Sequence, residues 1–187
     1  MEYIRVTKDH NNFEPDEMNL ISGALKFKNI KVVDVMTPLS DVFMLPYNSI
    51  LNFETMAKIN NSGYSRIPIY EGDISNVVAM LHVKDLALID AKQELKLETV
   101  LKFYQHPLIS VFEDVTLQYM LAEFKKGKSH MALCRRVVDN GINDPTYELL
   151  GVVTLEDVIE ELIQAEINDE TDIVSKYFYC FNLNFNL

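Results

Sequence analysis

The segment GVVTLED, residues 151–157, places a hydroxyl and a carboxylate where an apolar strand is expected to lead into a helix. At that helix start the hydroxyl of Thr154 and the free backbone amides can hold a phosphate group. Asp157, one turn later, can accept two hydrogen bonds from the vicinal hydroxyls of a ribose. Gly151 indicates that a ligand or another backbone comes close to the strand. The pattern favours a nucleotide site, with one alternative: Thr154 is only an N-cap, and Glu156 and Asp157 offset the helix dipole.

No catalytic constellation accompanies this segment. No serine, cysteine or threonine is paired with a base, and no glycine-rich phosphate loop occurs. Glu160 and Glu161 are adjacent on one expected helix and so face different ways, which does not make an acid–base pair. The histidines are scattered along the chain without the spacing of zinc ligands: His10, His82, His106 and His130. We therefore expect a chain that is not an enzyme and that has no metal ligands of its own.

Composition excludes several classes of protein. The chain has 187 residues, 48% of them hydrophobic, and a net charge of −11. It can bury one sizeable core or two small repeats that share one, and no apolar run approaches the roughly 20 residues that span a membrane. Two cysteines in unrelated contexts suit a reducing compartment. Residues 137–175 hold 11 acidic side chains and no lysine or arginine, which disfavours nucleic acid and attracts Mg²⁺ or basic partners, or is simply a solvated face.

The sequence pattern of the elements that position these residues occurs twice in the chain. NSGYSRIPIYEGDISNVVAMLHVKDL is matched by KKGKSHMALCRRV and YELLGVVTLEDVIEEL, and MTPLSDVFML is matched by QHPLISVFED. Each copy has an amphipathic helix closed by glycine, two apolar strands and an acidic helix start, which predicts an α/β (α+β) fold of tandem repeats with pseudo-two-fold symmetry. The first copy has His82 and Asp85 where the second has Thr154 and Asp157.

The pattern also predicts individual elements. A helix begins at Pro15, with Leu20, Ala24 and Phe27 on one stripe and Gly23 allowing close packing. Residues 65–70 form an edge-type strand that tolerates its proline. A helix runs from Leu155 to about Ile167. We divide the chain into four parts by residue number: an N-terminal flank with a linker helix (1–29), a first repeat (30–93), a second repeat (94–172) with a long loop (137–147), and an atypical tail (173–187).

These motifs together resemble the CBS-domain pair, or Bateman module, of the cyclin-M (CNNM, ancient conserved domain protein) magnesium-transport mediators. VVDVMTPLSDVFML, SGYSRIPIYEGD, HVKDL, EFKKGKSHMA and DPTYELLGVVTLEDVIEELI carry the resemblance, which covers about residues 16–172. The chain is similar, less closely, to the bacterial CorC/hemolysin-C proteins. The resemblance implies tandem CBS repeats with small mixed sheets flanked by helices.

The resemblance implies one ATP with Mg²⁺ between the repeats, the ion arriving with the nucleotide. Thr154 and Asp157 match the positions that hold phosphate and ribose, and Thr37 matches a position near the base. The adenine pocket corresponds to four residues of the GYSRIP motif: Tyr64, Arg66, Ile67 and Pro68. Arg66 is also expected to reach phosphate, whereas plain strand packing is the alternative for Ile67 and Pro68. Because His82 replaces a threonine in the first copy, one nucleotide is expected and not two.

The same resemblance implies partners. Asp144, in the long loop, matches an aspartate presented to the active site of phosphatases of regenerating liver, although an ordinary Asp-Pro turn is the alternative. A homodimer through the CBS repeats and a membrane domain of the full-length protein are expected, and nucleic acid is not. The module, soluble by itself, would lie at the cytosolic face of a membrane, the plasma membrane by expectation. Two other functions stay open: an interaction platform with a vestigial nucleotide site, and a CBS pair regulating a metabolic enzyme.

Overall fold

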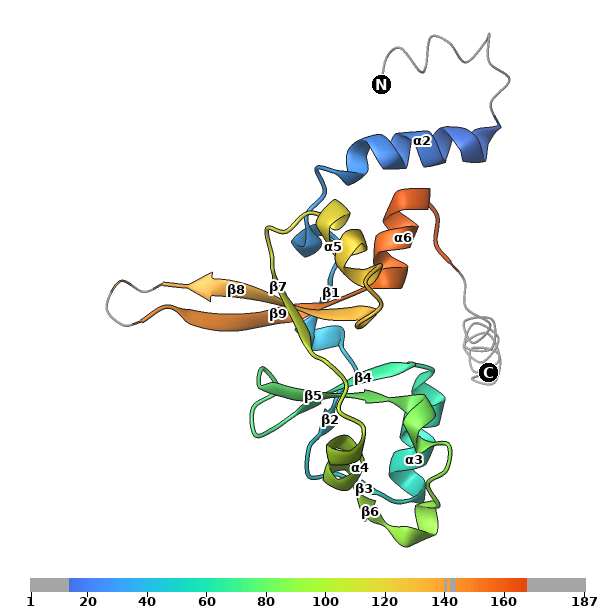
Figure 1. Ribbon diagram of the computed structural model, residues 1–187, viewed down its shortest axis with the longest axis vertical. Helices are drawn as coiled ribbons and strands as arrows, with labels where there is room; N and C mark the ends of the chain where they lie inside the picture. Colours follow the sequence, from blue (N-terminus) through green and yellow to red (C-terminus); the bar gives the residue numbers. More distant parts are fainter. Residues whose placement is uncertain (1–13, 140, 142–143, 168–187) are drawn as a thin grey trace, which may run out of the picture.

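The computed structural model describes residues 14–139, 141 and 144–167. It consists of two halves, each a small sheet with helices packed on it, stacked along the long axis of the molecule (Figure 1). The mixed α/β class and the tandem CBS architecture predicted from the sequence are confirmed. The predicted tail, 173–187, lies outside the described residues. No helix in the described part of the chain combines the length and the apolar character needed to cross a membrane.

The first half is built on a three-stranded sheet of order β2-β4-β5, in which β4 runs parallel to β2 and antiparallel to β5. A short antiparallel pair, β3 with β6, completes it. Its elements are β2 (Leu45–Pro46), β3 (Ile50–Leu51), α3 (Phe53–Ser62), β4 (Arg66–Tyr70), β5 (Val77–His82), η3 (Val83–Leu86), η4 (Ala91–Gln93), β6 (Leu95–Lys96) and α4 (Leu97–Phe103).

The second half is built on a four-stranded sheet of order β1-β9-β8-β7. β8 and β9 form a long antiparallel ribbon, and β7 runs parallel to β8. Its elements are α2 (Pro15–Phe27), η1 (Val32–Asp34), β1 (Thr37–Pro38), η2 (Leu39–Asp41), β7 (Ile109–Phe112), α5 (Leu117–Phe124), β8 (Met131–Val138), β9 (Thr146–Thr154) and α6 (Leu155–Ile163).

Side-chain caps set the ends of the connecting helices. Asn52 accepts a hydrogen bond from the backbone amide of Thr55 at 2.9 Å and so begins α3. The same helix ends at Gly63, whose φ of 73° is a left-handed conformation that glycine adopts without steric cost. The sequence therefore predicted this helix and its end correctly.

The sequence predicted an edge strand around Pro68, and this prediction is wrong. β4 lies between β2 and β5, and Pro68 pairs with Met80 of β5. On the other side β2 reaches only as far as Ile69 and Tyr70. The missing N–H of the proline is tolerated because the neighbouring strand is too short to require it.

The packing does not follow the order of the repeats along the chain. Phe27 and Val32, which precede the first repeat's sheet, are buried in the core of the second half. Leu97 and Leu101 of α4, which follow the predicted boundary at residue 93, are buried in the core of the first half. The first half thus completes its core with α4, which follows the predicted end of its repeat. The second half completes its core with a segment that precedes the first repeat's sheet. These two exchanges tie the halves together.

A third cluster of buried side chains joins the two sheets. Val77 and Met80 from β5 pack with Met131, Leu133 and Val152 from the ribbon. Fully burying one side chain of this size contributes about 1.5–3 kcal/mol. The halves are therefore expected to unfold together as a single cooperative unit.

The linker helix α2 packs on α6 through a close backbone approach. A Cβ atom built on Gly23 would lie 2.1 Å from the carbonyl oxygen of Leu162, so only glycine fits there. The predicted role of Gly23 is confirmed, but the predicted stripe is only partly buried, because Phe27 is in the core whereas Leu20 is 45% exposed. Helix α6 itself ends at Ile163, four residues earlier than predicted, because Gln164 adopts a left-handed backbone with φ of 54°.

The predicted loop 137–147 is shorter than expected because its two ends are strand. The β8–β9 ladder continues to the pairs Val137–Tyr147 and Val138–Thr146, and the ribbon projects from the body of the second half (Figure 1). Asp144 lies in sequence between Val138 and Thr146, which form the last pair of this ladder, and it is exposed. The ribbon therefore places Asp144 away from both cores (Figure 1).

Candidate functional site

Thr154 and Asp157 form a reciprocal cap at the point where β9 meets α6. The backbone N–H of Thr154 donates to Oδ2 of Asp157 at 2.7 Å, and the N–H of Asp157 donates to the Thr154 hydroxyl oxygen at 3.2 Å. The N-cap role considered from the sequence is thus present. Both side chains lie at the start of α6, where the Thr154 hydroxyl and the Asp157 carboxylate could also bind a ligand.

Asp157 is held in a partly desolvated position. Burial raises the pKa of its carboxyl group, the hydrogen bonds from Thr154 oppose that shift, and the nearby charges of Glu160 and Glu156 add to it. A carboxylate that has lost part of its hydration interacts more strongly with hydroxyl donors than a fully solvated one does.

Thr37 lies beside this cap on the neighbouring strand. It pairs with Val152, two residues before Thr154, and Pro38 pairs with Gly151. A Cβ atom on Gly151 would lie 2.1 Å from the carbonyl oxygen of Thr37. Of the two explanations for this glycine, ligand or backbone, the close approach of β1 is therefore the one that the structure shows.

Arg66 reaches the same place from the first half. Its Nη2 atom lies 3.3 Å from Nδ1 of His130, whose backbone carbonyl accepts the first amide of α6, from Leu155, at 2.9 Å. Among the described residues, none accepts a hydrogen bond from the buried Nε of Arg66. A guanidinium with an imidazole partner and an unused N–H, close to a helix start, is suited to receive an anion.

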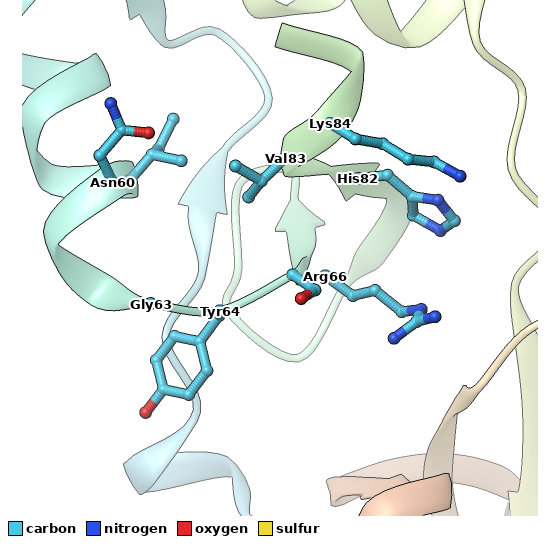
Figure 2. A pocket seen from close by; sticks show the side chains of 9 residues that line it. Asn60, Gly63, Tyr64, Arg66, His82, Val83 and Lys84 are labelled. Carbon is cyan, nitrogen blue, oxygen red and sulfur yellow. The ribbon is translucent and has the colours of Figure 1, made fainter. Parts of the chain in front are cut away.

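A cavity of ≈ 330 Å³ opens beside Arg66 (Figure 2). Arg66, His82 and Lys84 extend on one side of it, and Tyr64 extends on another. Tyr64 is 53% exposed, and its ring lies 6.0 Å from that of Phe43 in a stacked arrangement. This cavity therefore combines cationic side chains with an accessible aromatic face.

Ile67 and Pro68 are placed differently from Tyr64 and Arg66. Ile67 is fully buried and belongs to the core cluster of the first half, together with Leu45 and Leu81. Pro68 is buried on β4. Strand packing, the alternative considered for both, accounts for their burial, and contact with a nucleotide stays a prediction.

A second cavity, of ≈ 500 Å³, is lined in part by Asp157. Besides Asp157 it is lined by the carboxylates of Asp34, Glu160, Glu161 and Glu166, and among the described residues no lysine or arginine lines it. Asp157 thus lies at the edge of a negative cavity, while Arg66 lies at the edge of a positive one. An anion at this helix start would need a cation on the acidic side.

Sequence reasoning missed His130, which contacts Arg66 and whose carbonyl holds the start of α6. It also missed that His82 and His106 meet, with ring centroids 3.7 Å apart. A signal for His106 existed, since the match of QHPL with MTPL aligns it with Thr37.

The shifted pKa of His82 predicts how the stability of the folded chain depends on pH. Burial, with the charges of His106 and Arg66 adding to it, lowers the pKa of His82 from 6.5 to about 4. Between these values the unfolded chain binds a proton that the folded chain does not, so stability falls as the pH is lowered through this window. We expect the urea midpoint, measured in a chelating buffer, to drop more between pH 6.5 and 4 in the unmodified chain than in His82→Gln. Equal drops in both chains would show that His82 is not shielded.

The chain is 45% identical over 177 residues to the metal transporter cnnm-1 of Caenorhabditis elegans, which covers 94% of the chain and 22% of that protein. It is 29% identical to the CBS domain of a bacterial CNNM/CorC family Mg²⁺ transporter solved in complex with ATP, with a TM-score of 0.67 over 82% of the chain and 100% of that domain. The chain belongs to the CNNM/CorC family.

Another solved structure of a CNNM/CorC CBS domain, in complex with an inhibitor, is 26% identical with a TM-score of 0.71. It covers 89% of the chain and 96% of that domain. No family model matches the chain. The chain spans about a fifth of the length of the curated CNNM relative, and the part it corresponds to is the CBS-domain pair.

Proposed function

We propose that this CBS pair binds one ATP with Mg²⁺ between its halves and thereby regulates a membrane-bound mediator of divalent-cation transport. The observation that carries the proposal is the meeting of Arg66, from the first half, with the Thr154–Asp157 cap of the second half through His130. The three residue types supply what a nucleotide needs: a cation for phosphate, a hydroxyl at a helix start, and a carboxylate for ribose. A solved CNNM/CorC relative holds ATP in the corresponding domain.

In this proposal ATP acts by changing the populations of two arrangements of the halves. The ligand contacts both halves at once, so it favours the arrangement in which both sets of contacts are made. The module itself catalyses nothing and passes its state to the membrane domain of the full-length protein, at the cytosolic face of the membrane. Two copies associate through their CBS repeats.

A melting experiment tests this proposal on the chain as it stands. Saturation at 100 times the dissociation constant stabilises a folded protein by about 2.7 kcal/mol, which corresponds to a rise in Tm of about 5–10 °C for a chain of this size. We expect that rise with ATP and Mg²⁺ together, and little change with Mg²⁺ alone. An unchanged Tm at millimolar ATP and Mg²⁺ would contradict nucleotide binding.

Magnesium is expected to matter for ATP affinity. Asp157, Glu160 and Glu161 line a cavity next to the proposed phosphate position, and in the part of the chain that the structure describes no basic side chain lines that cavity. Like charges about 8 Å apart repel by about 2 kcal/mol at an effective dielectric of 20, so ATP without its cation should bind more than tenfold more weakly. Titration in a chelator and in millimolar Mg²⁺ measures the difference, and equal affinities would show that the carboxylates lie too far from the phosphates.

We further propose that the β8–β9 ribbon docks a phosphatase of regenerating liver through Asp144. Three features support the proposal: Asp144 is exposed beyond the end of the ladder, the ribbon projects from the body (Figure 1), and apolar side chains are exposed along it. Val137 is 48% exposed, and Tyr147, 61% exposed, lies against Phe112 with ring centroids 6.0 Å apart. A carboxylate at a turn beside an apolar surface suits a partner whose catalytic loop binds phosphate anions.

A further inference from the structure

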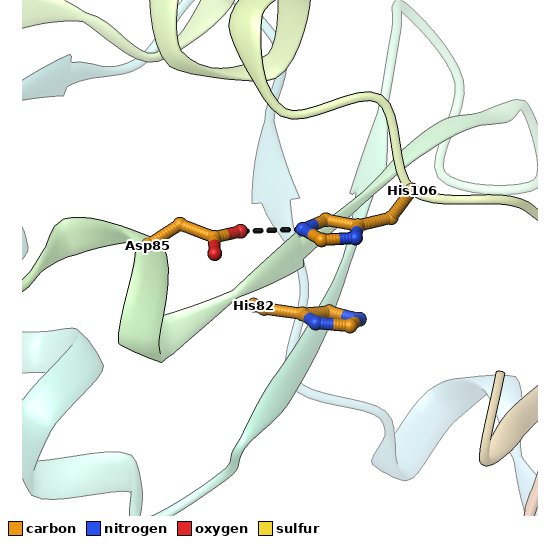
Figure 3. A group of neighbouring side chains, drawn as sticks. All are labelled: His82, Asp85 and His106. Atoms are coloured by element: carbon orange, nitrogen blue, oxygen red, sulfur yellow. Dashed lines mark hydrogen bonds and ion pairs between the residues drawn. The ribbon is translucent and has the colours of Figure 1, made fainter. Parts of the chain in front are cut away.

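Three side chains that can bind a metal ion meet in the first half (Figure 3). His82 ends β5, Asp85 lies in η3, and His106 lies between α4 and β7. Nε2 of His106 is 2.5 Å from Oδ2 of Asp85, and the His106 ring stacks on that of His82 with centroids 3.7 Å apart. The segment from Tyr104 to Leu108 is therefore held against the end of β5.

The cluster occupies the position that is equivalent by repeat to the proposed nucleotide site, here called the first cleft. His82 and Asp85 stand at a strand end and three residues later, as Thr154 and Asp157 do in the second half. In the second half the carboxylate closes a cap with its own threonine, whereas Asp85 is hydrogen bonded to an imidazole from a distant segment. The first cleft has therefore acquired a different chemistry.

His106 is also at an equivalent position. It precedes Pro107 and Leu108 as Thr37 precedes Pro38 and Leu39. The two hydroxyl residues of the proposed nucleotide site, Thr154 and Thr37, thus correspond by repeat to His82 and His106, and the carboxylate is kept. Hydroxyls suit ribose and phosphate, whereas two imidazoles and one carboxylate are ligands that Zn²⁺ prefers.

We propose that His82, Asp85 and His106 bind one divalent transition-metal ion of the Zn²⁺ class. Each residue offers one ligand atom, and the three atoms lie within 4.8 Å of one another. The Asp85 side chain is 7% exposed and that of His106 is 22% exposed, so the donors are partly shielded from bulk water. A water molecule would complete a four-coordinate site, as in other sites with three protein ligands. Mg²⁺ is disfavoured because it prefers oxygen ligands in an octahedral arrangement.

Binding requires a defined local movement. The lone pair of an imidazole nitrogen lies in the plane of its ring, and the two rings are now nearly parallel, at 9°. They must rotate so that both nitrogens point to one ion. The ion then replaces the proton shared by Nε2 of His106 and Oδ2 of Asp85, this proton goes to solvent, and the two atoms separate to about 3.3 Å, as ligands at 2.0–2.1 Å from one ion do.

The ion would fix the segment that leads into the second half. With His106 bound to the same ion as His82 and Asp85, residues 104–108 are clamped onto the first half and the first cleft is filled. This inference does not rest on ATP binding, because none of the three ligands is among the residues proposed to hold ATP, although His82 also lines the cavity beside Arg66. A metal-bound first cleft would nonetheless leave a single cleft for nucleotide.

Cobalt(II) is the probe for the test, because its visible d–d bands report four-coordinate binding. We expect the chelator-treated chain to bind one Co²⁺, to release it to equimolar Zn²⁺, and to show no thiolate band. His82→Ala and His106→Ala should each weaken binding at least about 100-fold, since loss of even an outer partner of a metal ligand costs 10–100-fold. Asp114→Ala, which removes an exposed acid outside the cluster, is the matched control and should bind normally.

Histidine ring NMR on the unmodified chain keeps the test decisive if a variant fails to fold. Zn²⁺ should shift the ring signals of His82 and His106 and leave those of the other histidines in place. Absence of Co²⁺ bands at stoichiometric metal would overturn the proposal. So would unchanged binding by the folded double variant His82→Ala/His106→Ala, or Zn²⁺ shifts confined to other histidines.

Discussion

Thr154→Ile is expected to weaken ATP binding by about ten- to 150-fold. The change removes the hydroxyl at the start of α6 and adds bulk where the phosphate is proposed to lie. A hydrogen bond to a charged group contributes about 1.5–3 kcal/mol, which corresponds to that range of affinity. Calorimetric titration of the variant with ATP and Mg²⁺ measures the loss. Unchanged affinity in a folded Thr154→Ile chain would remove Thr154 from the site.

Two control variants distinguish the loss of ATP binding from the loss of the helix cap. Thr154 also caps α6, and loss of a cap costs about 1 kcal/mol of stability. Thr116 caps α5 in the same way, accepting from the backbone amide of Tyr119, and lines none of the cavities described above. Thr116→Ile should therefore lower the Tm and leave ATP affinity unchanged. Thr154→Ser keeps the hydroxyl and should keep most of the binding.

Asp144→Ala is expected to weaken phosphatase binding by about 2–5 kcal/mol. If the carboxylate enters the catalytic pocket, the variant loses a charge-assisted contact with the arginine that normally receives phosphate, and breaking a buried pair of this kind costs that much. Folding should not change, because the residue is exposed near a turn. A pull-down against the phosphatase, with ATP titration of the same variant, measures the two functions separately.

Glu148→Ala is the matched control for this experiment. Glu148 is an exposed acid on the same ribbon, where it pairs with Arg136 across the ladder. Its removal changes the net charge as Asp144→Ala does but leaves the turn intact. Equal losses in both variants would indicate general charge attraction, and full binding by Asp144→Ala would leave this aspartate as an ordinary Asp-Pro turn.

The sequence predicted the elements whose signals are local. The helix ended by Gly63, the buried strand of GVVT and the cap at Thr154 each depend on a few neighbouring residues, and each is present. The doubling of these signals was enough to predict the tandem architecture. The early end of α6 was missed, since its apolar periodicity continues past the left-handed Gln164.

Contacts between distant segments were not predictable in this way. β1, β2, β3 and β6 have two residues each, too few for any alternation to show. The burial of Leu97 and Leu101 in the first core, and of Phe27 in the second, depends on how the halves close and not on any local pattern. The meeting of His106 with Asp85, 21 residues apart in sequence, is of the same kind.

The candidate site contains residues that the sequence predicted and a contact that it did not predict. Thr154 and Asp157 were found from their spacing, and their mutual hydrogen bonds lie within four residues. The contact between Arg66 and His130 joins residues 64 apart and required the structure. The ribbon that replaces both ends of the predicted loop depends on cross-strand pairing, which a run of turn-forming residues around Asp144 did not reveal.

The most direct test of a nucleotide site between the halves is the stoichiometry of ATP binding by the unmodified chain. Calorimetric titration in millimolar Mg²⁺ counts the sites per chain. We predict one, because Arg66 and the Thr154–Asp157 cap come together through His130, whereas at the position equivalent by repeat Asp85 is hydrogen bonded to His106. Two sites per chain, or no heat of binding at all, would contradict this account.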